Sequence, residues 1–201
     1  MNLEFLKNKS DKIFENITRI RNIIDHVRAF SRSHDDYVPI AFDINQSIQN
    51  AVSMIGEQFK HLGINLSLHL DKNIPPLIGN IYRLEQVIVN LLTNAKDAVL
   101  EKKSKQEAYF EMHVEIKTFQ DNLFLVIEIT DNGIGIINED IHNIMLPFYT
   151  TKDEGKGTGL GLSICYQIIK EMGGNIDIVS DGVSGTKIKL AFNTQKKEND
   201  M

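Results

Sequence analysis

The sequence has one cysteine and no long apolar run, and each shortage excludes a class of protein. The single cysteine, Cys165, rules out an internal disulfide and is typical of a reducing compartment. No apolar stretch reaches the about 18 residues that a membrane-spanning helix needs, and the N-terminus lacks the apolar core of a signal peptide. We therefore expect a cytoplasmic segment without membrane contact, although a parent protein could be anchored by segments outside this chain.

An excess of basic residues is also absent. The 201 residues carry a net charge of −5 and no long basic stripe, so nucleic acid is not an expected partner. Hydrophobic residues make up 42% of the chain and charged residues 24%, which suits one ordinary core plus a short additional element. Cys165 lies in an apolar stretch, which predicts a buried and unreactive thiol.

Residues 1–31 have the periodicity of one long helix. Its apolar residues recur at spacings of 4, 3, 4 and 3, at Ile13, Ile17, Ile20, Ile24 and Val27. Such a heptad seam predicts pairing with a partner helix, and packing on the chain's own domain is the alternative. A polar break then predicts a hinge, so we expect a helix and hinge over 1–36, a second unit over 37–195 and a disordered tail over 196–201.

The rest of the chain alternates between strand and helix patterns. Strands are expected over 38–42, 64–70, 108–119, 123–130, 176–179 and 186–192, and helices over 44–59, over 81–100 and from the glycine-rich region to about residue 172. Asp43 is a candidate N-cap, residues 120–122 a hairpin turn, and Gly173 with Gly174 a helix stop. This order predicts an α+β fold, a two-layer sandwich of one mixed β-sheet with helices on one face, preceded by the long helix.

The helix expected over 81–100 has a polar face opposite a wide apolar face. The polar residues lie about one turn apart: Arg83, Gln86, Asn90, Asn94 and Asp97. Two stacked asparagines are poor helix formers without a structural role, and an amide oxygen is a hard neutral ligand that suits Mg²⁺. A solvated polar face explains the same pattern, and by itself the pattern favours that interpretation.

Two glycine-rich segments suggest contact with a nucleotide. In the first, Asp131 is followed by Gly133 and Gly135, so a flat ring could approach the backbone while the carboxylate accepts a hydrogen bond from an exocyclic amine; an ordinary turn is the alternative. The second, residues 155–162, opens a helix whose free amides could bind an anion, whereas a flexible loop is the alternative. It matches neither a Walker loop nor a dinucleotide-binding fingerprint.

Together, residues 90–95, 131–135, 147–152 and 157–162 resemble the asparagine, first glycine, phenylalanine and second glycine boxes of sensor histidine kinases. Residues 182–186 are similar to the final glycine-threonine turn of that family. The resemblance covers residues 38–193 and implies the Bergerat ATP-binding fold of the gyrase, Hsp90, histidine kinase and MutL superfamily, with ATP and Mg²⁺ as cofactors.

The resemblance implies a role for each matching position. Asn94 would bind Mg²⁺, Asn90 would face the phosphates, Asp131 would hold adenine, and residues 148–158 would form a mobile lid from which Lys152 reaches the γ-phosphate. The full implied nucleotide-binding set is Asn90, Asn94, Asp131, Gly133, Gly135, Ile136, Thr151, Lys152, Gly157, Thr158, Gly159, Leu160, Gly161, Leu162 and Thr186.

Two positions depart from patterns in the superfamily. Hydrolysing members carry a glutamate base where this chain has Asn90, and an amide cannot take a proton, so we expect slow hydrolysis. Glu85 lies at the edge of the buried face and is not assigned to the site. Asp97 occupies a position where many histidine kinases have a basic residue.

Within the N-terminal helix, residues 19–32 resemble the second helix of the family's dimerisation hairpin. A first helix with the phosphoacceptor histidine does not precede it, and His34 lies after the helix, so neither His34 nor another histidine of the chain is assigned as the acceptor. The resemblance implies a protein-histidine kinase that transfers the ATP γ-phosphoryl group to a histidine outside this chain and does not autophosphorylate in isolation. A homodimer of the parent protein and a response regulator receiver domain are the expected partners.

Three alternatives remain open at this point. The chain could be an ATP-hydrolysing clamp, an anti-sigma-type serine kinase of the same superfamily, or a nucleotide-switched interaction module without catalysis.

Overall fold

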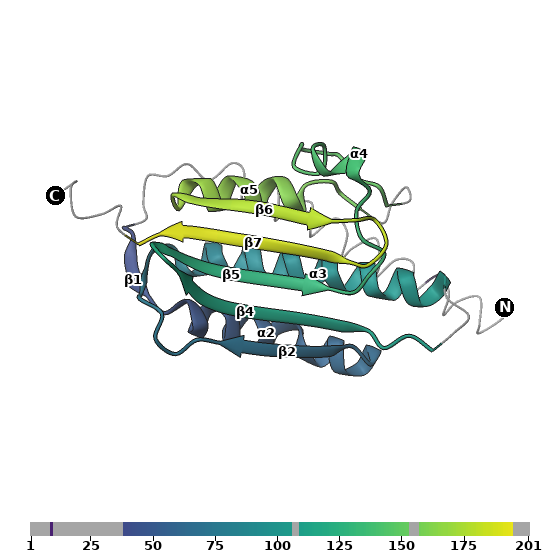
Figure 1. Cartoon of the computed structure of the whole chain (residues 1–201), viewed down its shortest axis with the longest axis horizontal. Coiled ribbons are helices and arrows are strands. Elements are labelled where there is room, and N and C mark those ends of the chain that lie inside the picture. The colour runs from purple at the N-terminus through teal and green to yellow at the C-terminus, as the bar shows by residue number, and fades with distance from the viewer. Residues whose placement is uncertain (1–8, 10–37, 106–108, 153–156, 195–201) are drawn as a thin grey trace.

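A single mixed sheet organises the part of the chain that the computed structural model describes, which is Lys9 and residues 38–105, 109–152 and 157–194. Its five strands, in spatial order, are β2 (Asn65–Leu70), β4 (His113–Asp121), β5 (Phe124–Asp131), β7 (Thr186–Asn193) and β6 (Gly174–Ser180) (Figure 1). β2 and β4 are parallel, and the other neighbours are antiparallel. The helix expected over 1–31 and the tail over 196–201 lie outside the described residues, apart from Lys9.

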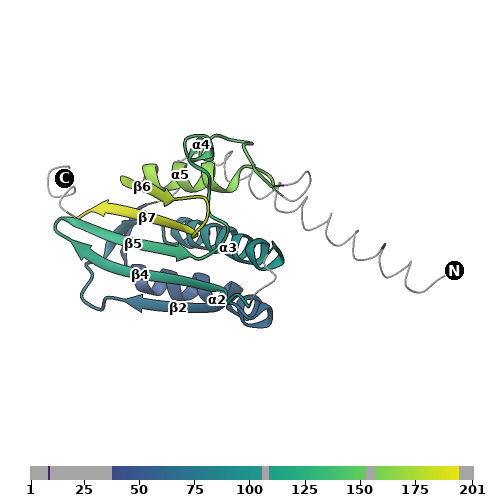
Figure 2. The same ribbon diagram turned by 45° about the vertical axis from the view of Figure 1, so that its right-hand side comes forward.

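The three longest helices of the described part lie on one face of this sheet. α2 (Ile44–Leu62), α3 (Ile81–Lys105) and α5 (Gly161–Glu171) run behind the strands in Figure 1, and the turned view in Figure 2 shows the two layers. The strands alternate accordingly: in β4, Val114, Ile116 and Thr118 are buried, and the residues between them are partly exposed. The expected two-layer α+β fold is confirmed.

The other face of the sheet has no helix over it within the described residues, and it carries paired charges. Lys117 lies 2.6 Å from Glu115 and Lys187 lies 3.3 Å from Glu128, each pair joining carboxylate and ammonium. Exposed pairs of this kind contribute at most about 1 kcal/mol each. Their main effect is to keep much of this face polar, whereas the main apolar core lies on the helical side.

The central helix α3 supplies the apolar face that the sequence predicts. Its buried apolar residues are Leu84, Val87, Ile88, Leu91, Leu92, Ala95 and Val99. The helix continues to Lys105, one turn beyond the expected end near Leu100, and an ion pair of 2.7 Å between Lys105 and Glu101 links side chains four residues apart in this added turn. The asparagines therefore lie near the middle of a long helix that is anchored by its buried face.

The ends of two other helices form as expected. The carboxylate of Asp43 accepts a hydrogen bond of 2.8 Å from the Asn45 amide, which confirms the N-cap of α2. That helix continues past Phe59 and ends before Gly63, which has a left-handed backbone with φ of 71°. After α5, Gly173 has φ of 73° and ends the helix, whereas Gly174 already belongs to β6.

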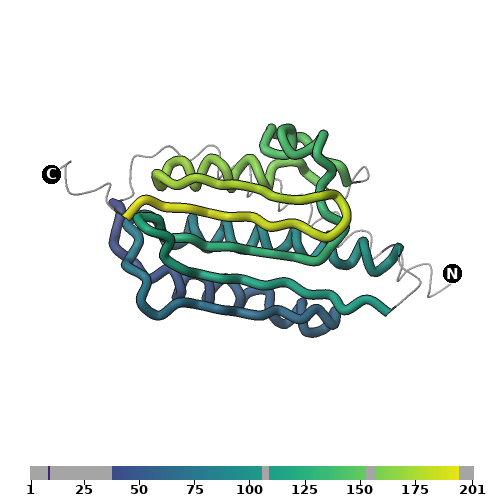
Figure 3. The backbone as a smooth tube through the Cα atoms, in the orientation of Figure 1, coloured from purple at the N-terminus to yellow at the C-terminus, as the bar shows by residue number. Residues whose placement is uncertain are grey.

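Three local features differ from the expectation. β1 (Ile40–Phe42) does not join the main sheet but pairs with β3 (Leu77–Gly79), which was not predicted. β3 could form because the prolines before it, Pro75 and Pro76, precede the paired residues and remove no hydrogen bond from the strand. The short helix α4 (Asn138–Ile141) was also not predicted, and it follows the end of β5 near the β6–β7 turn (Figure 3).

The hairpin between β4 and β5 is confirmed, but its turn is shifted. Asp121 pairs with Phe124, so the turn consists of Asn122 and Leu123 rather than residues 120–122. Asn122 adopts φ of 53°, a conformation that asparagine tolerates better than most residues.

Candidate functional site

Asp131, the last residue of β5, is a buried carboxylate held by main-chain donors. Its side chain is 8% exposed, and its Oδ1 accepts a hydrogen bond of 2.8 Å from the Gly133 amide. The Thr186 amide also donates to it, from the strand position that pairs with Asp131. Burial raises the pKa of Asp131 to about 6, against these two hydrogen bonds and the charge of Lys102. At neutral pH the carboxylate can therefore accept a hydrogen bond from a ligand amine.

The segment after Asp131 lies tightly against α3 and the β6–β7 turn. A Cβ atom at Gly133 would come within 2.6 Å of the Ala98 main chain, so a side chain does not fit there. Gly135 has φ of 74°, and the Ile136 amide donates a hydrogen bond of 2.8 Å to the Ser180 hydroxyl. The structure thus brings Gly133, Gly135 and Ile136 together beside Asp131, as the sequence predicts.

Asn90 and Asn94 lie one turn apart on the partly exposed face of α3. The side chain of Asn90 faces the Cys165 thiol, and its buried Nδ2 atom has no oxygen or nitrogen partner within the described residues. Its amide can therefore offer only Oδ1 to a ligand without turning. Cys165 itself is fully buried, and burial raises the pKa of its thiol to about 12, in agreement with the prediction of an unreactive cysteine.

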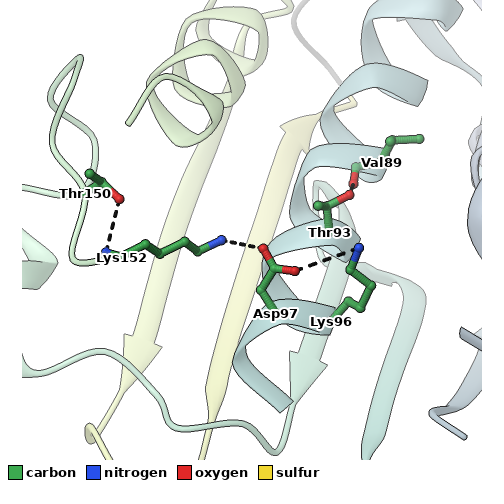
Figure 4. A network of polar contacts seen from close by, with 6 residues as sticks. All are labelled: Val89, Thr93, Lys96, Asp97, Thr150 and Lys152. Atoms are coloured by element: carbon green, nitrogen blue, oxygen red, sulfur yellow. Dashed lines mark hydrogen bonds and ion pairs between the residues drawn. The ribbon is translucent and has the colours of Figure 1, made fainter. Parts of the chain in front are cut away.

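A lysine connects the segment after Pro147 to the polar face of α3. Lys152 Nζ lies 2.6 Å from Asp97 Oδ2, and Figure 4 shows the lysine side chain reaching across to the helix. On the other side of the same carboxylate, Lys96 Nζ lies 3.8 Å from Asp97 Oδ1. The Thr150 hydroxyl accepts a hydrogen bond of 3.2 Å from the Lys152 amide, which orders the backbone at this point. Thr151 is exposed next to it.

The two ends of the glycine-rich segment meet before α5 begins. The Phe148 amide donates a hydrogen bond of 2.9 Å to the Gly159 carbonyl, and these residues have φ of 67° and 65°. Gly157 packs against Thr150, where a Cβ atom would lie 2.4 Å from the threonine hydroxyl. Residues 153–156, between these two ends, lie outside the described residues.

The start of α5 offers main-chain donors rather than side chains. Leu160 is buried and Leu162 is partly buried in the core, so both predicted residues could contribute to a site through their backbone only. The Thr158 hydroxyl accepts a hydrogen bond of 3.4 Å from the Leu160 amide. The first amides of a helix have no partner within the helix, and together with the helix dipole they favour an anion at this end.

Two charged residues of α3 lie outside this arrangement. The carboxylate of Glu85 is buried and accepts a hydrogen bond of 2.7 Å from the Asn50 side chain, which supports its exclusion from the site. Arg83, at the start of the polar face, forms an ion pair of 2.9 Å with Glu171 of α5. Both side chains join helices to one another.

Sequence reasoning missed Lys102 and Ser180. Lys102 Nζ donates hydrogen bonds to three main-chain carbonyls, and the Ser180 hydroxyl bridges the Ile136 amide and the Gly185 carbonyl, to which it donates at 2.6 Å. Lys102 follows the expected helix end, and a lone lysine or serine carries no recognisable pattern. The periodicity of a longer helix would have been the only signal for Lys102.

Among the described residues, no group of three or more histidine, cysteine, aspartate and glutamate side chains could hold a metal ion. No described helix is long and apolar enough to cross a membrane.

Residues 79–196, more than half of the chain, match the family described as "Histidine kinase-, DNA gyrase B-, and HSP90-like ATPase". With the mixed sheet, the buried Asp131 and the glycine segments in place, the chain belongs to this ATPase family. Membership supports ATP as the ligand of the site and a kinase or ATPase role.

Individual relatives agree with this assignment. The chain is 30% identical over 179 residues to the two-component sensor PprA of Pseudomonas aeruginosa, which covers 89% of this chain and 19% of PprA. It is 31% identical over 186 residues to the sensor kinase CckA of Brucella abortus, which covers 89% of this chain and 19% of CckA. The chain thus spans less than a third of the length of the first curated relatives that it matches.

Solved structures share the fold. The catalytic domain of histidine kinase ThkA superposes with a TM-score of 0.66 at 24% identity, over 79% of this chain and 99% of that domain. ThkA in complex with response regulator protein TrrA gives a TM-score of 0.75 at 21% identity, over 98% of this chain and 54% of that chain.

Proposed function

We propose that this chain is the ATP-binding catalytic core of a two-component sensor histidine kinase. It would transfer the γ-phosphoryl group of ATP to a histidine outside this chain. The observation that carries the proposal is the convergence of distant segments on residues 94–102 of α3. The Ile134 amide donates to the Ala98 carbonyl at 3.3 Å, Lys152 pairs with Asp97 at 2.6 Å, and Gly133 packs on Ala98.

At one end of this arrangement, Asp131 would recognise adenine. An ionised carboxylate accepts hydrogen bonds only, so it pairs with an exocyclic amine and repels a carbonyl at the same place. The backbone of Gly133, Gly135 and Ile136 would line the approach of the ring, and Thr186 would lie next to it. The main-chain contacts around Asp131 and the pairing of Asp131 with Thr186 support these roles.

At the other end, the asparagines of α3 and the start of α5 would hold the triphosphate. Asn94 would supply an oxygen to Mg²⁺, which neutralises phosphate charge when bound, and Asn90 would lie one turn earlier. Backbone amides from Gly157 to Leu162 would contact phosphate oxygens, as amides at helix starts do. Thr151 and Lys152 would close over the γ-phosphate from the lid, so Lys152 would exchange Asp97 for the nucleotide.

Three candidate positions on α3 offer no free general base for water. Asn90 is an amide, the Glu85 carboxylate is buried against Asn50, and the Asp97 carboxylate is paired with Lys152. Hydrolysis should therefore be slow, whereas an imidazole nitrogen can attack the γ-phosphorus without such help. In that step a nitrogen–phosphorus bond forms, the bond to the β–γ bridging oxygen breaks and ADP leaves. The protein would contribute positioning and charge neutralisation.

The surroundings of this core are part of the same proposal. Residues 1–36 would be a dimerisation helix and hinge, residues 37–195 the catalytic unit and residues 196–201 a tail. The parent protein would be a homodimer on the cytoplasmic side of a membrane or in the cytoplasm. The receiver domain of a response regulator would take the phosphoryl group next, and the ThkA–TrrA complex supports a partner of this kind.

Phosphoryl transfer in trans tests this function. The chain is incubated with γ-labelled ATP, Mg²⁺ and a helical hairpin that carries an acceptor histidine, and a hairpin without that histidine is the control. Acid-labile label on the histidine is expected. Bound ATP without label would leave an interaction module, label on a serine would favour an anti-sigma-type kinase, and rapid phosphate release without the hairpin would favour an ATP-hydrolysing clamp.

Asn94→Ala should lose the Mg²⁺-dependent part of ATP affinity, by about tenfold or more, because one oxygen ligand and its orientation are lost. The fold should persist, since Asn94 lies on the partly exposed face of α3. Titration calorimetry with and without Mg²⁺ measures the effect, and Gln86→Ala on the same face is the matched control. Equal Mg²⁺ dependence in both variants would refute the metal-ligand role.

A further inference from the structure

We infer that Lys102 is a positioning residue for the adenine end of the site. It holds the loop after β5 and the turn between β6 and β7 against α3, and thereby sets the place of the Asp131 carboxylate. This inference rests on the proposed function, since Asp131 reads adenine only if the chain binds ATP there.

All three donors of the ammonium group are used. Lys102 Nζ donates to the carbonyls of Asn132 at 2.9 Å, Gly133 at 3.0 Å and Val183 at 2.9 Å. An ammonium group has three N–H donors and no acceptor, so this set saturates it. Lys102 Nζ also lies 5.2 Å from the centre of the Phe110 ring, which adds a cation–π contact.

The two loops that Lys102 contacts also contain or lead to the main-chain amides that donate hydrogen bonds to Asp131. Gly133, whose carbonyl Lys102 holds, donates its own amide to Asp131 Oδ1. Val183 lies in the turn that leads to Thr186, and the Thr186 amide is the second donor to Asp131. One side chain on α3 therefore ties together both halves of the carboxylate's surroundings, although these halves are far apart in sequence.

The charge of Lys102 acts on Asp131 as well. It lowers the pKa of the carboxyl group, against burial, which raises that pKa to about 6. The residues that pair with Asp131 from β4 and β7 are Val114 and Thr186, which carry no charge. Within the described residues, Lys102 is the charged side chain that acts on this group. Loss of its charge should shift the pKa upward, so that less of Asp131 is ionised near neutral pH.

Lys102→Met tests the inference, with Lys103→Met as the matched control. Met keeps much of the side-chain volume but removes the charge and all three donors, and Lys103 is exposed on the same helical turn. Affinity for Mg²⁺-ATP is measured by calorimetry from pH 5.5 to 8. Wild type should lose affinity as the pH falls through about 6. In Lys102→Met, affinity at neutral pH should be lower than in wild type by a factor of up to about ten. The loss of affinity on acidification should also begin at a higher pH. Lys103→Met should match wild type in both respects.

If Lys102 only stabilised the fold, Lys102→Met would lower the melting temperature but would not shift the pH at which affinity for Mg²⁺-ATP falls, the acid limb of the binding curve. Lys102→Arg keeps the charge but replaces the compact ammonium by a planar guanidinium. It should retain the acid limb near that of wild type and bind less tightly. If folded Lys102→Met binds Mg²⁺-ATP with the affinity and the pH profile of wild type, the inference is overturned. If Lys102→Met does not fold, wild-type affinity in Lys102→Arg would overturn it. Absence of binding by wild type would instead refute the proposed function.

Discussion

Lys152 forms an ion pair with Asp97 in the structure, and in the proposed function it binds the γ-phosphate. In the structure its ammonium group neutralises the carboxylate of Asp97. Both side chains are partly exposed, so solvent screens the pair and it contributes little to stability. A γ-phosphate carries more negative charge than one carboxylate and would compete for the same lysine. Under the proposed function, ATP would therefore displace Asp97 from Lys152.

Lys152→Met should lower affinity for ATP several-fold while affinity for ADP changes less, because only ATP offers the γ-phosphate. Calorimetric titration of both nucleotides measures the ratio of the two affinities. Lys72→Met, an exposed lysine in the loop between β2 and β3, is the control. Equal losses for ATP and ADP would show that Lys152 does not distinguish them.

At the scale of elements, the glycines before and at the start of α5 have different roles. Gly159 has φ of 65°, and a Cβ atom there would lie 2.4 Å from the Phe148 carbonyl carbon. Gly161 opens α5, and a Cβ atom there would meet no atom within 4 Å. The first glycine is required for the contact between the two ends of the segment, whereas the second is required only if a ligand comes close to the backbone.

Gly159→Ala should destabilise the protein by about 1–2 kcal/mol or more, through left-handed strain and the clash with Phe148. Gly161→Ala should leave stability unchanged or raise it by up to about 1 kcal/mol, since alanine favours helix more than glycine does. Urea unfolding of the nucleotide-free proteins measures both changes. Equal stability of the two variants would contradict the role given to the turn at Gly159.

At the scale of the whole molecule, the site makes the fold less stable at neutral pH. The folded pKa of Asp131 is about 6, against 3.8 for the free group. Because the folded pKa is raised, the folded state binds more protons than the unfolded state between these values. The contribution of Asp131 to stability therefore increases as the pH falls through about 6 and is absent above it. The buried, ionised carboxylate therefore lowers the free energy of unfolding when no ligand is bound.

Asp131→Asn should remove this part of the pH dependence. Between pH 7.5 and pH 5, the free energy of unfolding of wild type should rise relative to that of the variant by about 1 kcal/mol, as linkage with the two pKa values requires. Urea unfolding at both pH values measures the difference, and the variant should also lose ATP affinity. An identical pH dependence in both proteins would show that Asp131 does not titrate in this range.

The sequence alone determined the features that depend on neighbours along the chain. The apolar repeat of α3 places Asn90 and Asn94 on one face, Asp43 caps α2, and the turn at Gly173 ends α5. The apolar, β-branched run before Asp131 predicts a strand there, and the structure extends it by one residue to Asp131. These features arise from backbone geometry and burial within one element, so a local pattern is sufficient to predict them.

Only the tertiary structure decided which groups meet across elements. Lys102 holds loops that lie 30 to 81 residues away in the sequence, Lys152 pairs with Asp97, and β1 pairs with β3. None of these contacts has a local pattern, because each depends on how the helices and the sheet pack. The raised pKa of Asp131 has the same origin, since burial by several elements, rather than the residue itself, sets the energy of its charge.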